Sequence, residues 1–230
     1  MIEENLRKVL QTIEAGKAKR IFADKNESVK LVAVTKNHDV QAMREAIDAG
    51  VSDIGENRIQ EARDKFNILE RRPVWHLIGH LQKNKAKYAV RMFDLIHSVD
   101  TMELALTLEK EAANIGKVQD VLVQVNLAKE AAKFGIYTEK LQPMLEELDD
   151  LPHLRLRGLM CIAPNYEDVE KTRPLFREMY EIFQRTKELP WKTANIVYLS
   201  MGMTHDYRIA VEEGANIVRV GTAIFGPRQY

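Results

Sequence analysis

The stretch KLVAVTKNHDVQAMREAIDAGVSDIG (residues 30–55) decides the fold. It opens with a short run of apolar, mostly β-branched residues and continues with a segment of helical period that ends at Gly50. A second short run, DIG (residues 53–55), follows. A strand, a helix and another strand in this order favour two parallel strands joined by a crossover helix, and a glycine after the last helical turn is a common helix stop.

The same alternation continues to the end of the chain. Strand-like runs lie at residues 30–35, 53–55, 74–79, 94–99, 120–126, 154–160, 196–200 and 216–221, with helical patterns between them. This predicts an α/β protein with a single (β/α)8 TIM barrel, one domain over residues 1–230. Residues 6–22 precede the first strand and predict an extra N-terminal helix outside the barrel. A doubly wound open sheet needs fewer strands, and its Gly-x-Gly-x-x-Gly fingerprint is missing after the first strand.

Composition excludes several classes of protein. The chain has 34 Lys and Arg against 34 Asp and Glu, and this zero net charge argues against a nucleic-acid partner. Its one cysteine excludes an internal disulfide framework and a cysteine-clustered zinc site. No apolar run approaches the roughly 20 residues that span a bilayer. The first residues, MIEENLRKVL, have the pattern of an amphipathic helix, not of a signal peptide. We therefore expect a cytoplasmic protein that does not act at a membrane.

Lys36 is the first candidate site residue. It follows a fully apolar run, so in a barrel it lies at the carboxyl end of the first strand, where active sites of this fold are built. Partial burial of a lysine frees its amine for Schiff-base chemistry. The alternative is a solvated lysine that merely ends a strand.

Small and hydroxyl residues follow the last two strands. Ser200 and Gly202 end the seventh, and Gly221 and Thr222 end the eighth. Loops at these places hold phosphate groups in many barrels, because backbone N–H groups point at the anion. Two ordinary strand-to-helix turns capped by Ser and Thr are the alternative.

Arg219 interrupts the apolar strand IVRVG and shares a face with Ile217 and Gly221. If this face points into the barrel, the guanidinium needs an acceptor, either on a ligand or on an internal acid such as Glu56. A lysine, a phosphate loop and an inward arginine together suit pyridoxal 5′-phosphate (PLP), with its aldehyde, phosphate and pyridine nitrogen. A class I aldolase-like barrel acting on a phosphorylated sugar is a weaker alternative.

Two histidines and the cysteine have plainer interpretations. His76 and His80 are four apart on a strand, which places them on one face but far from each other, so we expect no metal site. We expect His76 to be a hydrogen-bonded core residue and Cys161 to be inert packing.

Several long motifs then identify a family. They are LVAVTK (31–36), GENRIQE (55–61), WHLIGHLQKNK (75–85), VNLAKEAAKFG (125–135), RGLM (157–160), LSMGMTHD (199–206) and VRVGTAIFG (218–226). In this order they resemble the PLP homeostasis proteins, single-domain relatives of the alanine racemase N-terminal barrel, which has PLP fold type III.

The resemblance implies a role for each matching residue. Lys36 is implied as the Schiff-base lysine and Arg219 as the partner of the pyridine nitrogen. Further cofactor-binding residues implied in this way are Asn57, which lines the site, Met201 and Met203, which flank the ring, and Ser200, Gly202, Gly221 and Thr222, which hold the phosphate. Asn37 departs from the Thr or Tyr expected after the lysine, which affects the rim of the pocket.

The resemblance also implies function. Members bind PLP without an established reaction and act in intracellular PLP supply and in the balance of amino-acid and keto-acid pools. The chain stops at Tyr230, after the eighth unit, leaving no room for the second domain that supplies the other acid–base residue of a racemase. We therefore expect no catalytic residues, a monomeric PLP carrier or buffer, and PLP-dependent apo-enzymes as partners. A weak PLP-dependent racemase or related enzyme is the alternative.

Overall fold

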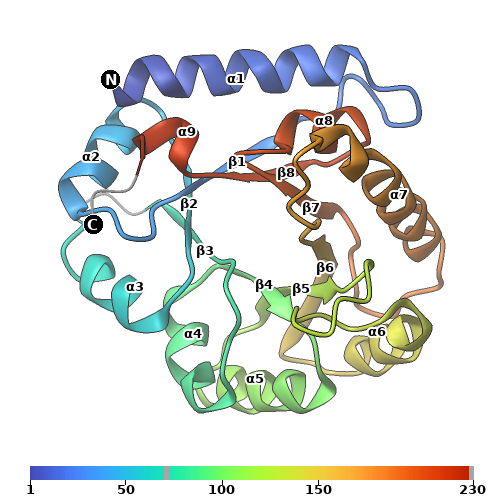
Figure 1. The fold of residues 1–230 in the computed structure, drawn as a ribbon. Coiled ribbons are helices and arrows are strands. Elements are labelled where there is room, and N and C mark those ends of the chain that lie inside the picture. The colour runs from blue at the N-terminus through green and yellow to red at the C-terminus, as the bar shows by residue number, and fades with distance from the viewer. Residues whose placement is uncertain (70–72, 228–230) are drawn as a thin grey trace.

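The computed structural model describes residues 1–69 and 73–227. Its strands form a closed parallel barrel in chain order, with β8 pairing with β1 (Figure 1). The strands are β1 (Lys30–Val34), β2 (Asp53–Glu56), β3 (Val74–Leu77), β4 (Leu95–Val99), β5 (Gln119–Val125), β6 (Leu154–Cys161), β7 (Tyr198–Met203) and β8 (Ile217–Val220). The predicted TIM barrel is confirmed, and every predicted strand is present.

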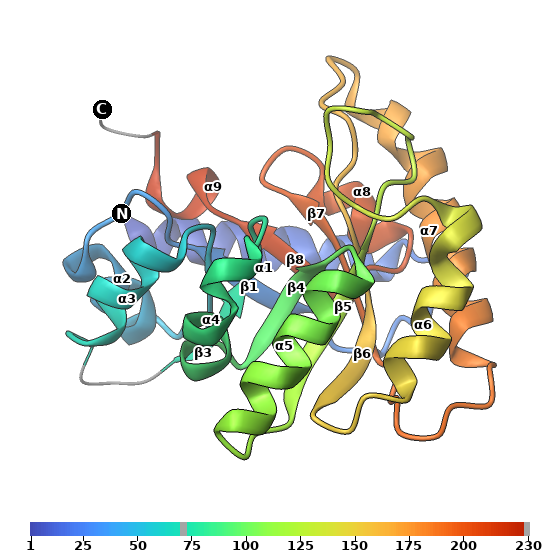
Figure 2. The same cartoon turned by 90° about the horizontal axis from the view of Figure 1, so that it is seen from below.

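Helices surround the barrel (Figures 1 and 2). They are α1 (Ile2–Ala18), α2 (Val40–Asp48), α3 (Ile59–Phe66), α4 (Ala86–Met92), α5 (Met102–Asn114), α6 (Leu141–Asp149), α7 (Arg173–Lys187), α8 (Tyr207–Glu212) and α9 (Thr222–Phe225). Short 3₁₀ turns precede three of them: η1 (Lys83–Lys85), η2 (Thr138–Lys140) and η3 (Val169–Thr172). Asp39 caps α2 and Thr101 caps α5, each by accepting a backbone N–H of the first turn. Within the described ranges no helix combines the length and apolarity needed to cross a membrane.

The extra N-terminal helix is also confirmed. α1 runs along the outside of the barrel and packs on α8 and α9, which belong to the last two units (Figure 1). Asn5 Nδ2 donates to the carbonyl of Ile224 at 3.0 Å, and Arg20 donates to the carbonyls of Val211 and Ala215. The helix spans Ile2–Ala18, so it starts and ends about one turn earlier than the predicted residues 6–22.

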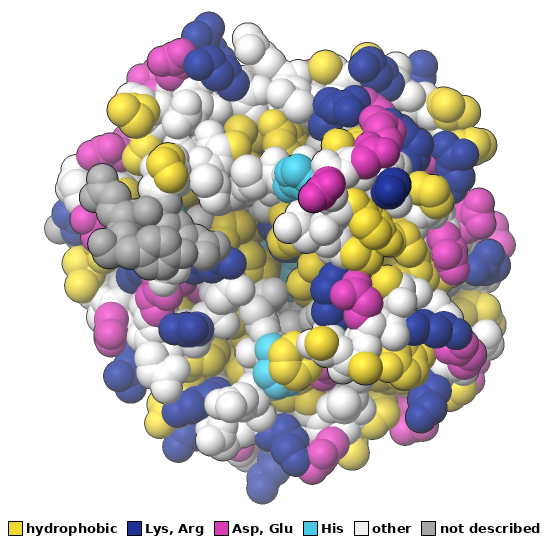
Figure 3. All heavy atoms as spheres, in the orientation of Figure 1, with side chains coloured by type: hydrophobic (Ala, Val, Ile, Leu, Met, Phe, Trp, Pro, Cys, Tyr) yellow, Lys and Arg dark blue, Asp and Glu magenta, His cyan; other side chains and the backbone are white. Residues whose placement is uncertain are grey.

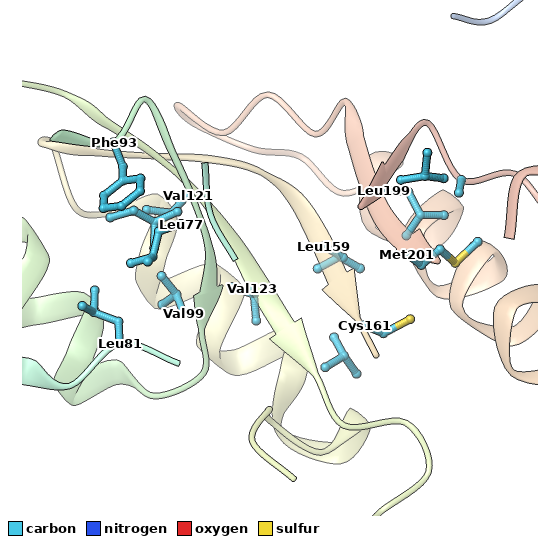
Figure 4. Close-up of a cluster of buried hydrophobic side chains, with 14 of the residues drawn as sticks. Leu77, Leu81, Phe93, Val99, Val121, Val123, Leu159, Cys161, Leu199 and Met201 are labelled. Carbon is cyan, nitrogen blue, oxygen red and sulfur yellow. The ribbon is translucent and has the colours of Figure 1, made fainter. Parts of the chain in front are cut away.

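Side chains alternate between two cores. A small cluster inside the barrel contains Val32, Leu95, Leu122, Met160 and Ile217. The larger cluster includes Leu159, Cys161, Leu199 and Met201 and fills the space between the strands and the helices (Figure 4). Successive strand residues point to opposite faces, so each polar strand residue belongs to one side of the wall.

β7 departs from its predicted end. The sequence pattern ended the strand at Ser200, whereas β7 continues to Met203. Its pairing with β8 shifts in register between Ser200 and Met203, and Gly202 within this shift has a φ of +92°. A Cβ at Gly202 would lie 2.5 Å from the Cβ of Ala210, so only glycine lets β7 pass this close to α8.

Candidate functional site

A cavity of about 550 Å³ opens at the carboxyl ends of the strands. Figure 3 shows this face of the molecule, which is hollowed near its centre. Among the predicted site residues, six line the cavity: Lys36, Asn57, Met203, Arg219, Gly221 and Thr222. The barrel therefore brings together residues that lie up to 186 positions apart in the chain, from Lys36 to Thr222.

The backbone on both sides of Lys36 is held in place. Lys65 Nζ, from α3, donates to the carbonyl oxygen of Thr35 at 2.7 Å. The N–H of Asn37 donates to Glu61 Oε1 at 2.5 Å, and Asn37 has a φ of +62°. Asparagine adopts this left-handed conformation more readily than most residues do. The residues that flank Lys36 are thus fixed by the same short helix.

A buried ion pair between Glu56 and Lys65 stabilises this arrangement on the side of the barrel wall that faces α3. Glu56 is fully buried, and its Oε1 accepts from Lys65 Nζ at 2.7 Å and from Thr35 Oγ1 at 2.5 Å. Burial raises the pKa of Glu56, although Lys65 and Thr35 act in the opposite direction. Glu56 faces α3 and not the interior, so the proposed pairing of Arg219 with Glu56 is wrong. Glu56 and the inward residue Asn57 are neighbours in sequence and point to opposite faces.

Arg219 points into the barrel, which is the case in which its guanidinium needs an acceptor, and it is 3 % exposed. Nη1 donates to Ser200 Oγ at 2.6 Å, and Nη2 donates to the carbonyl of Cys161 at 2.9 Å. Burial lowers the pKa of Arg219, while Cys161 and Asp206 oppose this shift. A guanidinium has more N–H groups than these two bonds use, and Arg219 also lines the cavity. It can therefore donate to a bound molecule.

Ser200 lies beneath the cavity and does not line it. Its Oγ is 2.9 Å from Nδ1 of His97, and Nε2 of His97 is 2.9 Å from Nδ1 of His76. Nε2 of His76 is in turn 2.8 Å from Asp53 Oδ1. The prediction that His76 is a hydrogen-bonded core residue is confirmed. His80 lies apart from it and stacks on the ring of Phe134.

The loops after β7 and β8 lie against each other. The N–H of Gly221 donates to Thr204 Oγ1 at 3.1 Å. Asp206 Oδ1 accepts from the N–H of Met203 at 2.6 Å, which closes the turn between β7 and α8. Burial raises the pKa of Asp206, and the Met203 amide and Arg219 partly offset it. The two predicted phosphate loops thus form one wall of the cavity.

Besides Ser200, two predicted site residues, Met201 and Gly202, do not line the cavity. The Met201 side chain lies in the outer hydrophobic cluster, so the expectation that it flanks a ligand ring is wrong for this side chain (Figure 4). Strand alternation places it on the face opposite Ser200. Met203 does line the cavity and is 38 % exposed. Gly202 does not line it and serves the close approach of β7 to α8.

Asn57 carries an unused polar atom. Its Oδ1 is buried and has no hydrogen-bond partner among the described residues, and the residue lines the cavity. Its backbone is closely packed, since a Cβ at Gly79 would lie 2.4 Å from the Asn57 carbonyl oxygen. Buried polar atoms are nearly always satisfied, so a bound molecule or a water is the expected partner.

The sequence did not reveal the residues that hold the site in place without lining the cavity. Lys65 and Glu61 have the i, i+4 spacing of a helical ion pair, which was a usable signal. His97 stands in the strand LIHSV (95–99), where its neighbours other than Ser98 are apolar, and was equally visible as a buried polar residue. The role of Asp53 depends on strand register and had no such signal.

Comparison with known proteins agrees with this geometry. Residues 2–229 match the family described as "Alanine racemase, N-terminal domain". A pyridoxal phosphate homeostasis protein of Aquifex aeolicus is 39 % identical over 228 residues, covering 99 % of this chain and 98 % of that protein. The structure of PipY from Synechococcus elongatus with PLP bound is 37 % identical, with a TM-score of 0.84, over 98 % of this chain and 100 % of that one.

A more distant likeness concerns the fold alone. Alanine racemase of Clostridium difficile is 16 % identical, with a TM-score of 0.70. The match covers 96 % of this chain and 56 % of the racemase, so the shared part is the barrel.

Proposed function

Because the chain belongs to the family of pyridoxal phosphate homeostasis proteins, we propose that it binds PLP in the cavity at the carboxyl ends of its strands and acts in PLP homeostasis. The observation that carries this proposal is the meeting of Lys36 and Arg219 in one cavity. These residues supply an amine and a fixed cation, which the aldehyde and the acceptor groups of PLP require.

The polar groups of the cavity fit PLP. Lys36 would hold PLP covalently through its amine, and PLP would supply the aldehyde for this bond, with water as the leaving group. Asn57 offers its unused side-chain oxygen, and Arg219 offers N–H donors from the floor. Gly221 and Thr222 would face the phosphate, with Ser200 and Gly202 supporting them indirectly.

The protein would act as a carrier or buffer of PLP. We infer that residues 1–230 form one PLP-binding domain, that the chain works as a monomer in the cytoplasm, and that it exchanges PLP with apo-enzymes. Homologous proteins are named for homeostasis and not for a reaction. A weak racemase is the alternative, because His205 lines the cavity together with Lys36 and gives a second group able to exchange protons.

Absorption spectroscopy tests the proposal. Protein mixed with PLP should gain an absorption band, and borohydride should convert the adduct into a stable mass increase on the peptide that contains Lys36. Lys36→Ala should lose both, and Lys83→Ala, an exposed lysine paired with Glu103, should keep both. A wild-type protein that gains no band with PLP would refute the proposal.

Transfer of PLP tests the carrier role. An apo-enzyme should regain activity when supplied with the PLP-loaded protein, and the rate should differ from that with free PLP at matched concentration. Identical rates would exclude direct delivery and leave buffering. Steady, Lys36-dependent turnover of an amino acid would favour the racemase instead.

A further inference from the structure

A hydrogen-bonded chain crosses the interior of the barrel beneath the cavity. It joins Arg219, Ser200, His97, His76 and Asp53 through contacts of 2.6, 2.9, 2.9 and 2.8 Å. These residues come from β8, β7, β4, β3 and β2, so the chain connects separate parts of the wall. We propose that His97 and His76 are positioning residues of the ligand site, which hold Ser200 as an acceptor and thereby fix the Arg219 guanidinium as a donor at the cavity floor.

With one proton on each imidazole, the carboxylate end sets the direction of the chain. Arg219 can only donate, so Ser200 Oγ accepts from it and has its own proton available to donate to Nδ1 of His97. His97 then carries its proton on Nε2 and donates to Nδ1 of His76. His76 likewise carries its proton on Nε2 and donates to Asp53, a carboxylate that only accepts. Both imidazoles then have the same tautomer, with the proton on Nε2.

The far end of the chain is well satisfied. Asp53 is 2 % exposed and also accepts from Lys30 Nζ at 3.0 Å and from Ser52 Oγ at 2.6 Å. Burial alone would raise the pKa of Asp53, but the hydrogen bonds from His76, Ser52 and Lys30 bring it down to about 2. A carboxylate that stays ionised keeps the acceptor at this end in place.

The middle of the chain resists protonation. His97 is fully buried, and burial lowers its pKa well below the ordinary value, with His76 and Arg219 adding to the effect. A second proton on His97 would occupy Nδ1 and remove the acceptor that Ser200 needs. Ser200 would then lose its fixed orientation, and so would the guanidinium that donates to it.

The consequence for ligand binding depends on the proposed function. Arg219 is held by Ser200 and by the carbonyl of Cys161, which leaves its other N–H groups for the cavity. A ligand atom above it must then be an acceptor, such as an unprotonated ring nitrogen. His97 and His76 touch no ligand in this arrangement and act through Arg219 alone.

Nitrogen NMR of the protein without PLP tests the hydrogen-bonded chain from Arg219 to Asp53 itself. At neutral pH, two-bond ¹⁵N–¹H spectra of the imidazoles should assign the proton of both His76 and His97 to Nε2, and neither ring should be doubly protonated. A proton on Nδ1 of either ring would overturn the proposal. This measurement needs no ligand, so it stands whether or not PLP binds.

Variants of His97 test the positioning role in PLP binding. His97→Phe keeps an aromatic ring but removes both hydrogen bonds, and should weaken PLP binding about tenfold, the equivalent of one lost buried hydrogen bond. It should also shift the absorption maximum of bound PLP. His97→Asn keeps an acceptor about where Nδ1 lies and should recover part of both effects. Ser98→Ala, at the next buried position of β4, is the matched control and should bind PLP like the wild type.

A double-mutant comparison separates positioning from a structural role. In an Arg219→Ala background, His97→Phe should cause no further loss of PLP affinity, because it acts only through the guanidinium. An equal loss in both backgrounds would overturn the proposal, as would an unchanged affinity and spectrum for His97→Phe. If His97→Phe does not fold, Ser200→Ala replaces it in the same comparison. Wild-type protein that fails to bind PLP would refute the proposed function. The NMR result would still show whether the hydrogen-bonded chain has the proposed direction.

Discussion

The side-chain amine of Lys65 donates to the backbone carbonyl of Thr35 at 2.7 Å, directly before the candidate Schiff-base residue Lys36. The same amine lies 2.7 Å from Glu56 Oε1 and 2.6 Å from Glu61 Oε1. Glu61 in turn accepts from the N–H of Asn37. A single buried cation thus connects α3 to the end of β1.

Removing this cation should destabilise the protein and disturb the site. Lys65→Met leaves the carboxylate of Glu56 buried and without its cation, which costs about 3–5 kcal/mol. Urea unfolding measures this loss, and PLP titration should show weaker binding because Lys36 loses its support. The double variant Glu56→Gln/Lys65→Met removes the buried charge and should recover much of the stability. If it were no more stable than Lys65→Met, the buried charge would not be the cause.

Lys8→Met is the matched control for that substitution. Lys8 pairs with Glu4 on the surface of α1, at an i, i+4 spacing. Both side chains are exposed, so the pair is screened by water, and the urea midpoint should stay close to that of the wild type.

Because of Asp53, the free energy of unfolding should depend on pH in the acid range. Its pKa in the folded protein is about 2, below the ordinary value of 3.8. A lowered acid pKa stabilises the fold above the ordinary pKa, and this contribution, about 2 kcal/mol, is lost as the pH falls from about 4 to about 2. Urea midpoints across this range should fall less steeply for Asp53→Asn than for the wild type. Parallel slopes would contradict the assignment.

Gly158 of β6 should not tolerate a side chain. Its φ is +147°, and a Cβ there would lie 1.9 Å from the carbonyl oxygen of Tyr198 on β7. Because the obstacle is backbone of the neighbouring strand, Gly158→Ala should cost more than about 3 kcal/mol or prevent folding. Gly116→Ala, with a φ of +64° and nothing within 4 Å, should cost only about 1 kcal/mol. Thermal unfolding of the two variants should therefore differ strongly, and similar midpoints would contradict the clash.

Cys161 should be unreactive in the folded protein. Burial raises the pKa of its thiol to about 12, although Arg219 acts in the opposite direction. Alkylating reagents attack the thiolate, so iodoacetamide at mildly alkaline pH should leave the native protein unmodified and label it once it is denatured. Mass spectrometry distinguishes the two outcomes, and rapid labelling of native protein would show that the thiol is accessible.

The number and order of strands could be predicted from the sequence, because the alternation of β-branched runs with helical segments is a local property. The carboxyl-end positions of Lys36, Asn57, Gly221 and Thr222 followed from the strand ends. The continuation of β7 to Met203 could not be predicted in this way. It depends on a register shift against β8 and on the close approach of Gly202 to α8, and both are tertiary features.

The polar interior was predictable only in part. Alternation along β8 placed Arg219 on one face with Ile217 and Gly221 but left open whether that face is the inner one, and a core position was expected for His76. The partners of these residues depend on which side chains on neighbouring strands reach one another across the barrel. Glu56 therefore seemed a candidate partner of Arg219, whereas the partner is Ser200. Met201 was placed at the ligand because a family motif does not state which face each of its residues occupies.

Because α1 packs on the last two units of the barrel, its native contacts can form only after those units have been synthesised. Asn5 bonds to Ile224 across 219 positions, and Arg20 bonds to Val211 across 191. On a ribosome the first helix therefore emerges long before the surface that buries it, and its apolar side stays without its native cover until the last strands have been made. The closing contacts of the barrel come last in synthesis, and until then the apolar side of this helix lacks the contacts with α8 and α9 that cover it in the folded protein.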